Sequence, residues 1–488
     1  MSGYVPRMPS LLLVLLFGCV PAPPAEDTQV AARMAEGADD PRFTDLVAWT
    51  EARMAEWQVP GAALAVVVDG QVHLVGLGVR QWGQPEPVTP DTRFRVASLS
   101  KMITGAIVAE EAAAGRLDLA APASDVLGDL TLVAPYSFAD FTLLDLVGHS
   151  SGLQSIGLPH SCDADPATLG ATMAELTPDW ALWAPQGELF LYSNQGYGLL
   201  GLAAERSAGV PFVDLAQARF DGAGMGTATY DWVEAYVGEH ATGHTMDLTT
   251  GRPLGYRGFE ERACVASFPS GGLMASARDQ SALLGVLLNE GEGWMTPAAW
   301  EIFTTQGYER SETGGYGFGV SSATYRGYTG LSHHGSLGGY FAMVWALPEA
   351  GVGVAVMVNS DHLVTDPPEP WSKPTQRIME RALDTFLGLD PVERTSSVRP
   401  VEEWSRYVGF YHSDYDLGNV AITLRDNTLW YADTTMAVPL LPYSRDAFQY
   451  AVPLDDGRIA YAGVSFVDDD ETGAITWVAT GFGLARRR

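Results

Sequence analysis

The feature that most constrains the fold is a change of pattern near residue 390. The stretch DPVERTSSVRPVEEW, over 390–404, is mostly polar and typical of a linker. Before it, strand-like segments lie near both ends of a region whose middle is largely helical, and after it only short strand-like segments follow. A length of 488 residues agrees with more than one domain, because one core rarely grows beyond about 300 residues. We therefore expect one domain over 41–390 and a second over 400–488.

Residues 41–390 predict an α+β domain. The segment 61–80 holds two β-branched runs around Asp69-Gly70, which indicates a hairpin, and 98–117 predicts a buried helix that stops near Gly115. We expect an antiparallel sheet flanked by helices, with a mostly helical subdomain. The other expected elements are helices over 272–291 and 376–389, two strands joined by a Pro/Gly turn within 333–360, and short helices and loops over 120–265.

Residues 400–488 change to an all-β pattern. The segments NVAITLRDNTLWYA, AFQYAVPL, GRIAYAGVSFV and AITWVATGFG are short and separated by turn signals. This pattern predicts a small all-β sandwich or barrel.

The N-terminus indicates export from a bacterial cell. Arg7 precedes the apolar run LLLVLLFG over 11–18, which is too short to span a bilayer, since spanning takes about 20 residues. We interpret 1–18 as a signal peptide and the Pro-rich 19–40 as a flexible tether. The sequence LFGC resembles a bacterial lipobox, which implies a lipid anchor on Cys19 in the periplasm or cell envelope. The bulky Phe17 leaves ordinary cleavage nearby open.

Charge and residue spacing narrow the partners. With 59 acidic and 29 basic residues, the net charge of -30 argues against nucleic acid and against electrostatic docking to anionic lipid. A lipid on Cys19 would then be the membrane contact. Cys162 and Cys264 could pair or remain separate buried thiols. His240 and His244 have the spacing of a metal pair, but a glycine between them and the lack of a third ligand indicate loop residues. We expect no metal and no cofactor, and the oligomeric state is left open.

The use of lysine is selective. Lys101 and Lys373 are the only lysines, whereas the other 27 basic residues are arginines. Lys101 follows Ser98 by three residues at the start of a predicted helix, so the two side chains share a helix face. A serine hydroxyl needs a base to take its proton. Arginine stays protonated, while burial readily lowers the pKa of a lysine. The pair therefore predicts a nucleophile and its base, beside helix N–H groups that could hold an oxyanion.

Two further motifs follow in order. Tyr192-Ser193-Asn194 precedes an apolar helix, and His333-His334-Gly335 lies at the predicted start of a strand. Ser-x-x-Lys, then Tyr-x-Asn, then a basic residue-x-Gly resembles the serine β-lactamase and penicillin-binding-protein family, in its class C β-lactamase-related branch. The stretches VTPDTRFRVASLSKM, FTLLDLVGHSSGL, PQGELFLYSNQGYGLLG, PSGGLMASARDQ and YGFGV resemble that branch as well, over about residues 45–390.

The resemblance implies a role for each motif residue. Ser98 would attack a carbonyl and form an acyl-enzyme. Lys101 and Tyr192 would together act as the base, with Tyr192 later passing a proton to the leaving group, and which takes the first proton is left open. Asn194 would hydrogen-bond Lys101 or the substrate amide. The backbone N–H groups of Ser98 and Ser336 would form the oxyanion hole.

His333 departs from the β-lactamase pattern. β-Lactamases usually carry lysine at this position, and His-x-Gly occurs in D-peptidase and esterase-like members of the family. Protonated His333 would attract a substrate carboxylate only at lower pH. His334 stands where a small Thr or Ser is common, which puts efficient β-lactam turnover in doubt. The substrate-binding strand would contribute His333, Gly335 and Ser336.

The stretch GHSSG, over 148–152, matches the nucleophile elbow of α/β-hydrolases and offers Ser150 as a competing nucleophile. That elbow needs a strand before it and a helix after it. The preceding TLLDLVG predicts a helix, so we interpret GHSSG as a structural segment.

We expect an exported serine hydrolase that acts on a small-molecule or peptide substrate, cleaving a peptide, amide or ester bond in the manner of a D-peptidase or esterase. One alternative is a true β-lactamase or D,D-carboxypeptidase. Another, of a different class, is a non-hydrolysing penicillin-binding sensor, against which Tyr192 argues. The all-β domain, opened by YVGFYHSDYD, resembles the lipocalin-like domains appended to this family. It would shape the substrate entrance, bind an apolar ligand or stabilise the enzyme.

Overall fold

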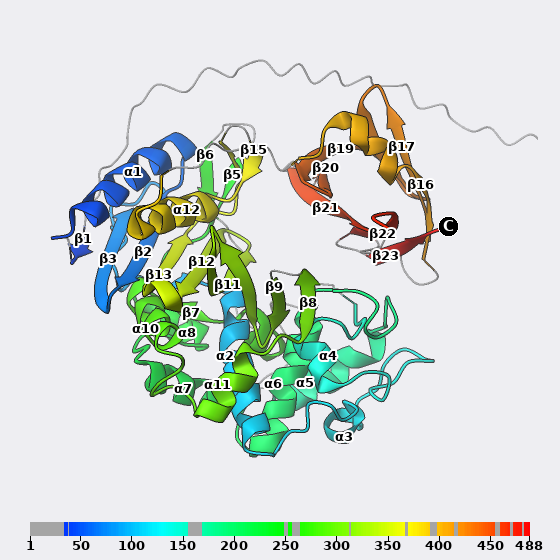
Figure 1. Ribbon diagram of the computed structural model, residues 1–488, viewed down its shortest axis with the longest axis horizontal. Coiled ribbons are helices and arrows are strands. Elements are labelled where there is room, and N and C mark those ends of the chain that lie inside the picture. The colour runs from blue at the N-terminus through cyan, green and yellow to red at the C-terminus, as the bar shows by residue number, and fades with distance from the viewer. Residues whose placement is uncertain are drawn as a thin grey trace, which may run out of the picture.

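The structure, a computed structural model, contains two parts, which Figure 1 separates clearly. One part is a sheet with helices on both faces and a helical lobe, and the other is a small β-barrel near the C-terminus. The described residues are 34–37, 39–154, 168–247, 252–255, 264–311, 314–366, 369–390, 398–413, 418–453, 459–468, 472–480 and 483–488. The expected signal peptide, most of the tether, Cys19 and Cys162 lie outside these residues.

Helices fill the middle of the first part, and strands lie toward both of its ends and throughout the second. The helices are α1 (Pro41–Trp57), α2 (Ser100–Ala113), α3 (Ser124–Leu127), α4 (Leu143–Val147), α5 (Leu169–Leu176), α6 (Asn194–Ala208), α7 (Phe212–Ala223), α8 (Trp232–Val237), α9 (Phe268–Gly271), α10 (Ala277–Leu288), α11 (Pro297–Thr304) and α12 (Pro374–Leu387). The strands are β1 (Met34–Glu36), β2 (Gly61–Val68), β3 (Gln71–Gly78), β4 (Phe94–Arg95), β5 (His244–Asp247), β6 (Arg252–Gly255), β7 (Met274–Ala275), β8 (Tyr308–Ser311), β9 (Gly314–Gly317), β10 (Val320–Tyr325), β11 (Tyr328–Leu337), β12 (Tyr340–Leu347), β13 (Val352–Val358), β14 (Val364–Asp366), β15 (Glu369–Ser372), β16 (Gly409–His412), β17 (Asn419–Arg425), β18 (Thr428–Ala432), β19 (Ala437–Ser444), β20 (Ala447–Pro453), β21 (Ile459–Asp468), β22 (Ile475–Thr480) and β23 (Gly483–Arg487).

The main sheet confirms the expected α+β architecture. Its order within the described residues is β1-β3-β2-β13-β12-β11-β10-β9-β8, and every neighbouring pair is antiparallel. The hairpin of β2 and β3 turns at Asp69 and Gly70, both with positive φ, which is the turn that an Asp-Gly pair favours. Strands from the two ends of this domain thus meet in one sheet, with β2 beside β13.

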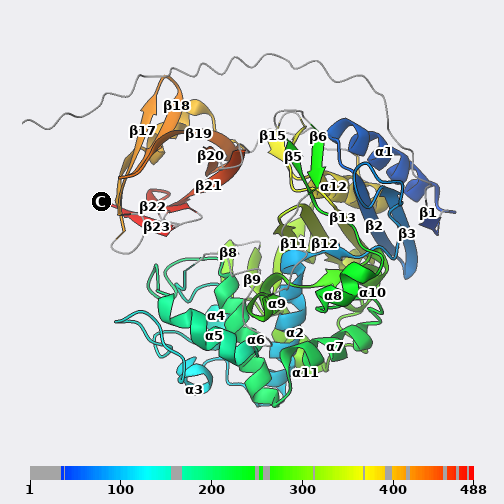
Figure 2. The ribbon, with the colours of Figure 1, turned by 180° about the vertical axis from the view of Figure 1, so that it is seen from behind.

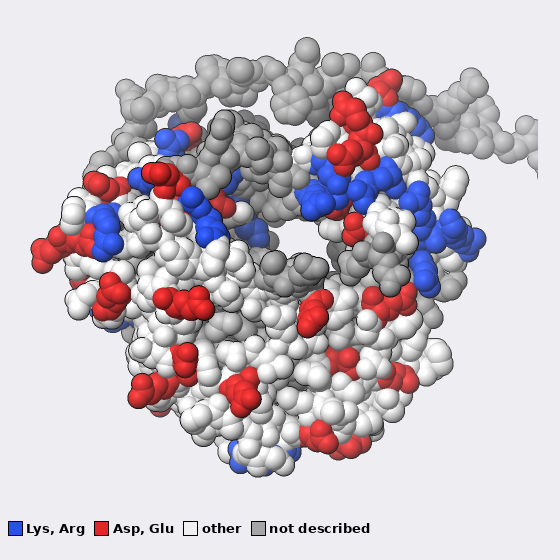
Figure 3. Space-filling view, in the orientation of Figure 1, with Lys and Arg blue, Asp and Glu red and all other residues white. Residues whose placement is uncertain are grey.

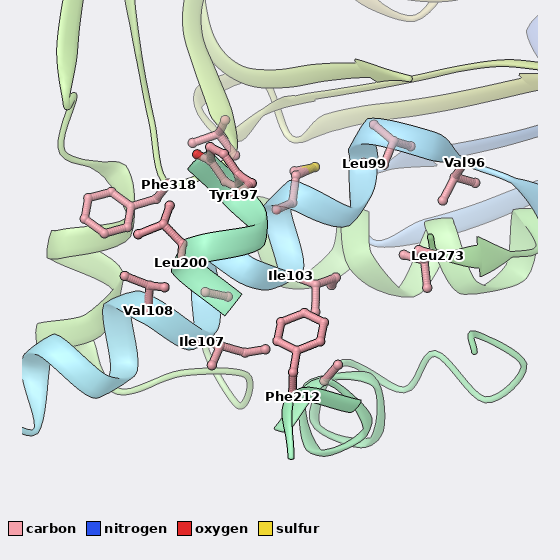
Figure 4. Packing of buried hydrophobic residues seen from close by; sticks show 14 of the residues in the cluster. Val96, Leu99, Ile103, Ile107, Val108, Tyr197, Leu200, Phe212, Leu273 and Phe318 are labelled. Carbon is pink, nitrogen blue, oxygen red and sulfur yellow. The ribbon is translucent and has the colours of Figure 1, made fainter. Parts of the chain in front are cut away.

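The helical lobe is built around α2. Its side chains are buried along nearly the whole helix, and Figure 4 shows Ile103 and Ile107 beside Phe212 of α7 and Leu200 of α6. Burying each such side chain contributes about 1.5–3 kcal/mol. Gly105 lies in the middle of this helix because a Cβ there would lie only 1.7 Å from the carbonyl oxygen of Phe318. This packing holds the start of α2 in a fixed position against the sheet.

The other face of the sheet is covered by α1 and α12. Phe43 and Leu46 from α1 and Ile378 and Leu383 from α12 pack on β2 and β13 in a second buried cluster. Figure 2, seen from behind, shows both helices on the side of the sheet away from α2. The sheet is therefore buried on both faces, which explains why β2 and β13 are apolar along their whole length.

The C-terminal part is a barrel. Of the two predicted all-β forms, a sandwich or a barrel, the structure therefore has the barrel. Within the described residues, β16 to β23 follow one another around the barrel in chain order and close between β23 and β16. Aromatic side chains fill its interior, with Tyr407 stacked on Phe466 at 4.5 Å between ring centroids and Phe448 beside both. The barrel therefore has an aromatic core of its own.

The two parts share a small apolar interface. Trp477 and Leu484 of the barrel pack against Trp183 and Leu189, and Arg486 lies 3.5 Å from the Glu188 carboxylate. In Figure 3 arginine side chains gather over the barrel, whereas the face of the larger part displays mainly acidic ones. The segment 183–189 leads directly to Tyr192, so the barrel contacts a candidate site segment.

The His-x-Gly motif lies at a different point of its strand than expected. His333-His334-Gly335 is in the second half of β11 and not at the start of a strand, because β11 begins earlier, after a turn at Arg326 and Gly327 with positive φ.

The cysteines and the membrane are the remaining points of comparison. Cys264 forms a disulfide, and the other two cysteines of the chain lie outside the described residues. In the described part of the chain, no helix is both long and apolar enough to cross a membrane.

Candidate active site

Ser98 lies in a tight turn at the start of α2. A short 3-10 turn over Ala97–Leu99 precedes the helix, and Ala97 has a φ of +50°, which a non-glycine residue adopts at a cost of about 1 kcal/mol or more. The turn is held on one side by the bond from the Val96 N–H to the Leu273 carbonyl. Ser98 itself is half-buried.

Strand β11 lies directly against this turn. A Cβ on Gly335 would lie 2.1 Å from the carbonyl oxygen of Val96, so glycine is required for the strand to approach Ser98 this closely. Beyond Ser332, the register of β11 continues with β12 alone, because β10 pairs only with the first half of the strand. The stretch from His333 to Leu337 therefore has an edge without a strand partner among the described residues, and Ser336 on it is exposed.

Lys101 is fully buried one turn after Ser98. Its Nζ lies 3.3 Å from the Ser98 Oγ, 2.7 Å from Oδ1 of Asn194 and 2.6 Å from the carbonyl oxygen of Ser270. A neutral Lys101 amine has two N–H donors, which match the carbonyl oxygens of Asn194 and Ser270. Its one lone pair can accept the hydroxyl proton of Ser98. Burial lowers the pKa of Lys101 well below its ordinary value, which favours this neutral form.

Tyr192 reaches the same point from the segment before α6. Ser193 caps α6 by accepting from the Gly196 N–H, so that Tyr192 and Asn194 flank the cap and both face Lys101. The Lys101 Nζ lies 4.8 Å from the Tyr192 ring centroid, and the phenol shares a hydrogen bond with Ser98. Burial raises the pKa of Tyr192 well above its ordinary value. A phenol held protonated is suited to donate a proton, which is the later of the two roles that the resemblance implies for Tyr192.

His333 is buried and fully engaged. Its Nδ1 lies 2.7 Å from the His334 carbonyl oxygen and its Nε2 lies 2.8 Å from the Tyr316 hydroxyl, so Nδ1 donates and Nε2 accepts. Burial, reinforced by the neighbouring His334, lowers the pKa of His333 well below its ordinary value. His333 is therefore neutral near neutral pH, and the expectation that its protonated form would attract a carboxylate concerns lower pH only.

His149 is a site residue that the sequence analysis missed. Its ring lies 4.3 Å from the ring of Tyr192 and 4.7 Å from that of Tyr316. Its Nδ1 accepts from the Ser193 N–H at 3.1 Å, and its carbonyl accepts from the Leu191 N–H at 2.7 Å. His149 thus holds the segment that carries Tyr192. The sequence signal that could have identified His149 is the GHSSG stretch itself, because its resemblance to a structural segment of the family indicated a packing role.

The sequence also offered Ser150 as a competing nucleophile and the spacing of His240 and His244 as that of a metal pair. Helix α4 precedes GHSSG, as expected, and the Ser150 hydroxyl donates to Asp145 at 3.1 Å, which is a structural contact. His244 is buried at the start of β5, where its Nε2 accepts from the Trp82 N–H and its Nδ1 lies 2.9 Å from the Asn359 carbonyl. His240 lies beside Tyr236 and the Gly238 carbonyl. The described residues contain no cluster of three or more side chains suited to hold a metal ion.

Comparison with known proteins gives a consistent result. A family model described as Beta-lactamase matches residues 46–373. Penicillin-binding protein 4 of Amycolatopsis lactamdurans is 27% identical over 330 residues, which cover 63% of this chain and 83% of that protein. Several curated β-lactamases match over shorter stretches, and the chain spans less than half the length of each of these relatives.

Solved structures share the fold. The octameric penicillin-binding protein homologue from Pyrococcus abyssi aligns with a TM-score of 0.63 and 23% identity, covering 91% of this chain and 100% of that one. A class C β-lactamase from Rhodobacter sphaeroides aligns with a TM-score of 0.53 and 23% identity, covering 70% of this chain and 98% of the other. From the family match, the relatives and the fold together, the chain belongs to the beta-lactamase family of serine hydrolases.

Proposed function

We propose that the chain is an exported hydrolase that cleaves a peptide, amide or ester through an acyl-enzyme on Ser98. The observation that carries this proposal is Lys101. Its fully buried amine has a lowered pKa and lies within hydrogen-bond reach of the Ser98 hydroxyl. Nucleophile and base within such reach, with the base oriented by further groups, is the general pattern of nucleophilic catalysis.

The reaction follows from these positions. The Ser98 Oγ attacks the substrate carbonyl carbon while its proton passes to the Lys101 Nζ. The tetrahedral oxyanion would be held by the backbone N–H groups of Ser98 and Ser336. The bond to the leaving group then breaks, and the leaving nitrogen or oxygen takes a proton from Tyr192, which recovers one from Lys101. Water attacks the acyl carbon in the same way, releases the acid and restores Ser98.

The remaining residues would orient this chemistry. Asn194 and the Ser270 carbonyl fix the Lys101 amine by accepting its two N–H groups. Gly335 allows β11 to approach the Ser98 turn, and the edge of β11 that pairs with no strand in the described part of the chain is suited to pair with an extended substrate.

A peptide, amide or ester of the D-peptidase or esterase type is favoured over a β-lactam. The support is the neutral, fully engaged His333 at the position where β-lactamases usually carry a lysine. A true β-lactamase or D,D-carboxypeptidase is the second candidate, supported by the β-lactamase and penicillin-binding relatives. A sensor that stays acylated is disfavoured, because the Lys101, Tyr192 and Ser98 contacts are intact for deacylation.

We further propose that the protein acts outside the cytoplasm, anchored by a lipid on Cys19, which the lipobox-like LFGC supports. Mass spectrometry of the native N-terminus tests this. A diacylglyceryl-modified Cys19 supports the anchor, and an unmodified N-terminus a few residues downstream contradicts it.

Labelling with a fluorophosphonate probe tests the nucleophile. The wild-type protein should be labelled on the peptide that contains Ser98. Ser98→Ala should lose the label, and Ser150→Ala, whose hydroxyl contacts Asp145, should keep most of it. Label that persists in Ser98→Ala and disappears in Ser150→Ala would contradict the proposal. Turnover of p-nitrophenyl esters, D-amino-acid amides and nitrocefin would then rank the substrates.

A further inference from the structure

The turn between β11 and β12 follows directly after the proposed oxyanion donor. Strand β11 ends at Leu337 and β12 begins at Tyr340, so Gly338 and Gly339 form a two-residue turn just beyond Ser336. In the described part of the chain, this end of β11 pairs with β12 and with no other strand. The position of the Ser336 backbone therefore depends on how firmly the turn is held.

Both backbone groups of Gly339 contact residues outside the hairpin. Its N–H donates to Oδ2 of Asp361 at 2.8 Å, and its carbonyl accepts from the His244 N–H at 3.2 Å. Asp361 and His244 are joined in turn, because the Asp361 N–H donates to the His244 carbonyl at 3.0 Å. A Cβ on Gly339 would lie 2.6 Å from the Cα of Gly243, so the segment 243–244 packs directly on the turn.

Buried side chains connect these contacts to the body of the sheet. His244 is fully buried, and since its Nε2 accepts from the Trp82 N–H, its Nδ1 donates to the carbonyl of Asn359 at 2.9 Å. Asn359 follows β13 and is also fully buried. Its side-chain amide donates to the carbonyls of Val79 and Arg80, which follow β3, at 3.2 and 2.9 Å. The turn is thus connected to the ends of β3 and β13.

The Asp361 carboxylate provides the strongest of the contacts to the turn. A hydrogen bond from a backbone N–H to a carboxylate is charge-assisted and about twice as strong as one between neutral groups. Burial raises the pKa of Asp361, whereas hydrogen bonds from the Gly339 N–H and the Thr245 side chain favour its ionised form. The carboxylate therefore has its own donors and holds the turn from the side opposite the Gly339 carbonyl.

We propose that Asp361 is a positioning residue for the oxyanion hole. By holding the Gly339 N–H, it keeps the end of β11 where the Ser336 N–H can meet the substrate oxygen beside the Ser98 N–H. This rests on the proposed acyl-enzyme chemistry at Ser98. Asp361 acts through the turn and not on the reacting atoms, and a displacement of about 1 Å at such a site can cost roughly 100-fold in rate.

A pair of esters that differ in one atom tests this assignment. A p-nitrophenyl ester develops its negative charge on oxygen, whereas the matching thionoester develops it on sulfur, a weak acceptor that gains little from the oxyanion hole. In Asp361→Ala, kcat for the ester should fall roughly 10- to 100-fold, while kcat for the thionoester should change by less than about threefold. Asp361→Asn keeps an uncharged acceptor, so its ratio of ester to thionoester kcat should lie between those of Asp361→Ala and the wild type.

His362→Gln is the matched control from the same segment. The His362 Nε2 donates to the Trp57 carbonyl at 2.7 Å, which is not part of the turn, so this variant should keep the wild-type ratio. Equal losses on both substrates in Asp361→Ala, or an unchanged ratio, would overturn the assignment. If Asp361→Ala does not fold, Asp361→Asn decides, because an unchanged ratio in that variant would overturn the assignment as well. Ester turnover that persists in Ser98→Ala would instead contradict the acyl-enzyme proposal.

Discussion

The ring of His149 lies 4.3 Å from the ring of Tyr192, and this contact joins the GHSSG segment to the candidate site. The Ser193 N–H donates to the His149 Nδ1, and the same histidine also lies beside Tyr197 and Tyr316. Tyr192 is therefore positioned by a residue 43 positions earlier in the chain.

His149→Ala should lower kcat up to roughly 100-fold, because a catalytic group displaced by about 1 Å loses a rate factor of that size. KM should change little, since the β11 edge is not touched. The measurement is steady-state kinetics on a p-nitrophenyl ester, with Ser150→Ala as the matched control from the same segment. Equal kcat values for the two variants would show that His149 does not position Tyr192.

Trp477 should couple the barrel to the Tyr192 segment. It is buried against Leu189 and Trp183, and Arg486 lies over its ring at 5.4 Å. Trp477→Ala should cost about 3–5 kcal/mol of unfolding free energy if the contact behaves like a buried core. Chemical denaturation monitored by fluorescence measures this cost, with Trp430→Ala, at a half-buried barrel position outside the interface, as the control. A smaller loss in Trp477→Ala than in Trp430→Ala would contradict a structural interface.

The pH dependence of acylation should follow Lys101. Its lowered pKa means that the amine is neutral above that value and protonated below it. The apparent kcat/KM should therefore fall as the pH falls through the lowered pKa, and should stay level above it while Tyr192, whose pKa is raised, remains protonated. His333→Gln should leave the midpoint of the acid limb unchanged, whatever its effect on the plateau, because His333 is already neutral. A midpoint that moves or disappears in this variant would assign the limb to His333.

Much of the fold could be predicted from local patterns. The Asp69-Gly70 turn, the buried α2 ending near Gly115, and the all-β C-terminal part are each determined by residues close in sequence. Ser98 and Lys101 lie within one helical turn, so their proximity also follows from spacing alone. The family resemblance supplied the order of the three motifs, and the structure brings all three together.

The remainder depends on contacts between distant segments. The neutral state of His333 follows from burial against Tyr316, and the contact of Asp361 with the β11–β12 turn follows from the pairing of distant segments, neither of which local patterns indicate. The start of β11 was missed because Gly330 and Ser332 weaken its strand pattern, while tertiary pairing with β10 and β12 forms it regardless. The choice of barrel over sandwich needed the closure of β23 on β16.

The central claim is that Lys101 takes the proton of Ser98, and Lys101→Arg tests it most directly. Arginine keeps a positive charge but cannot act as a base at ordinary pH. The acylation rate constant, measured by stopped-flow on a p-nitrophenyl ester, should fall on the order of 10²- to 10⁴-fold. Folding should be nearly unchanged, because both residues suit a helix. The acylation rate constant of Lys101→Met should fall to a similar degree. This would show that the loss comes from the missing base and not from the larger side chain of arginine. A Lys101→Arg enzyme that acylates within about threefold of the wild-type rate, well inside the smallest effect of a lost base, would contradict the account.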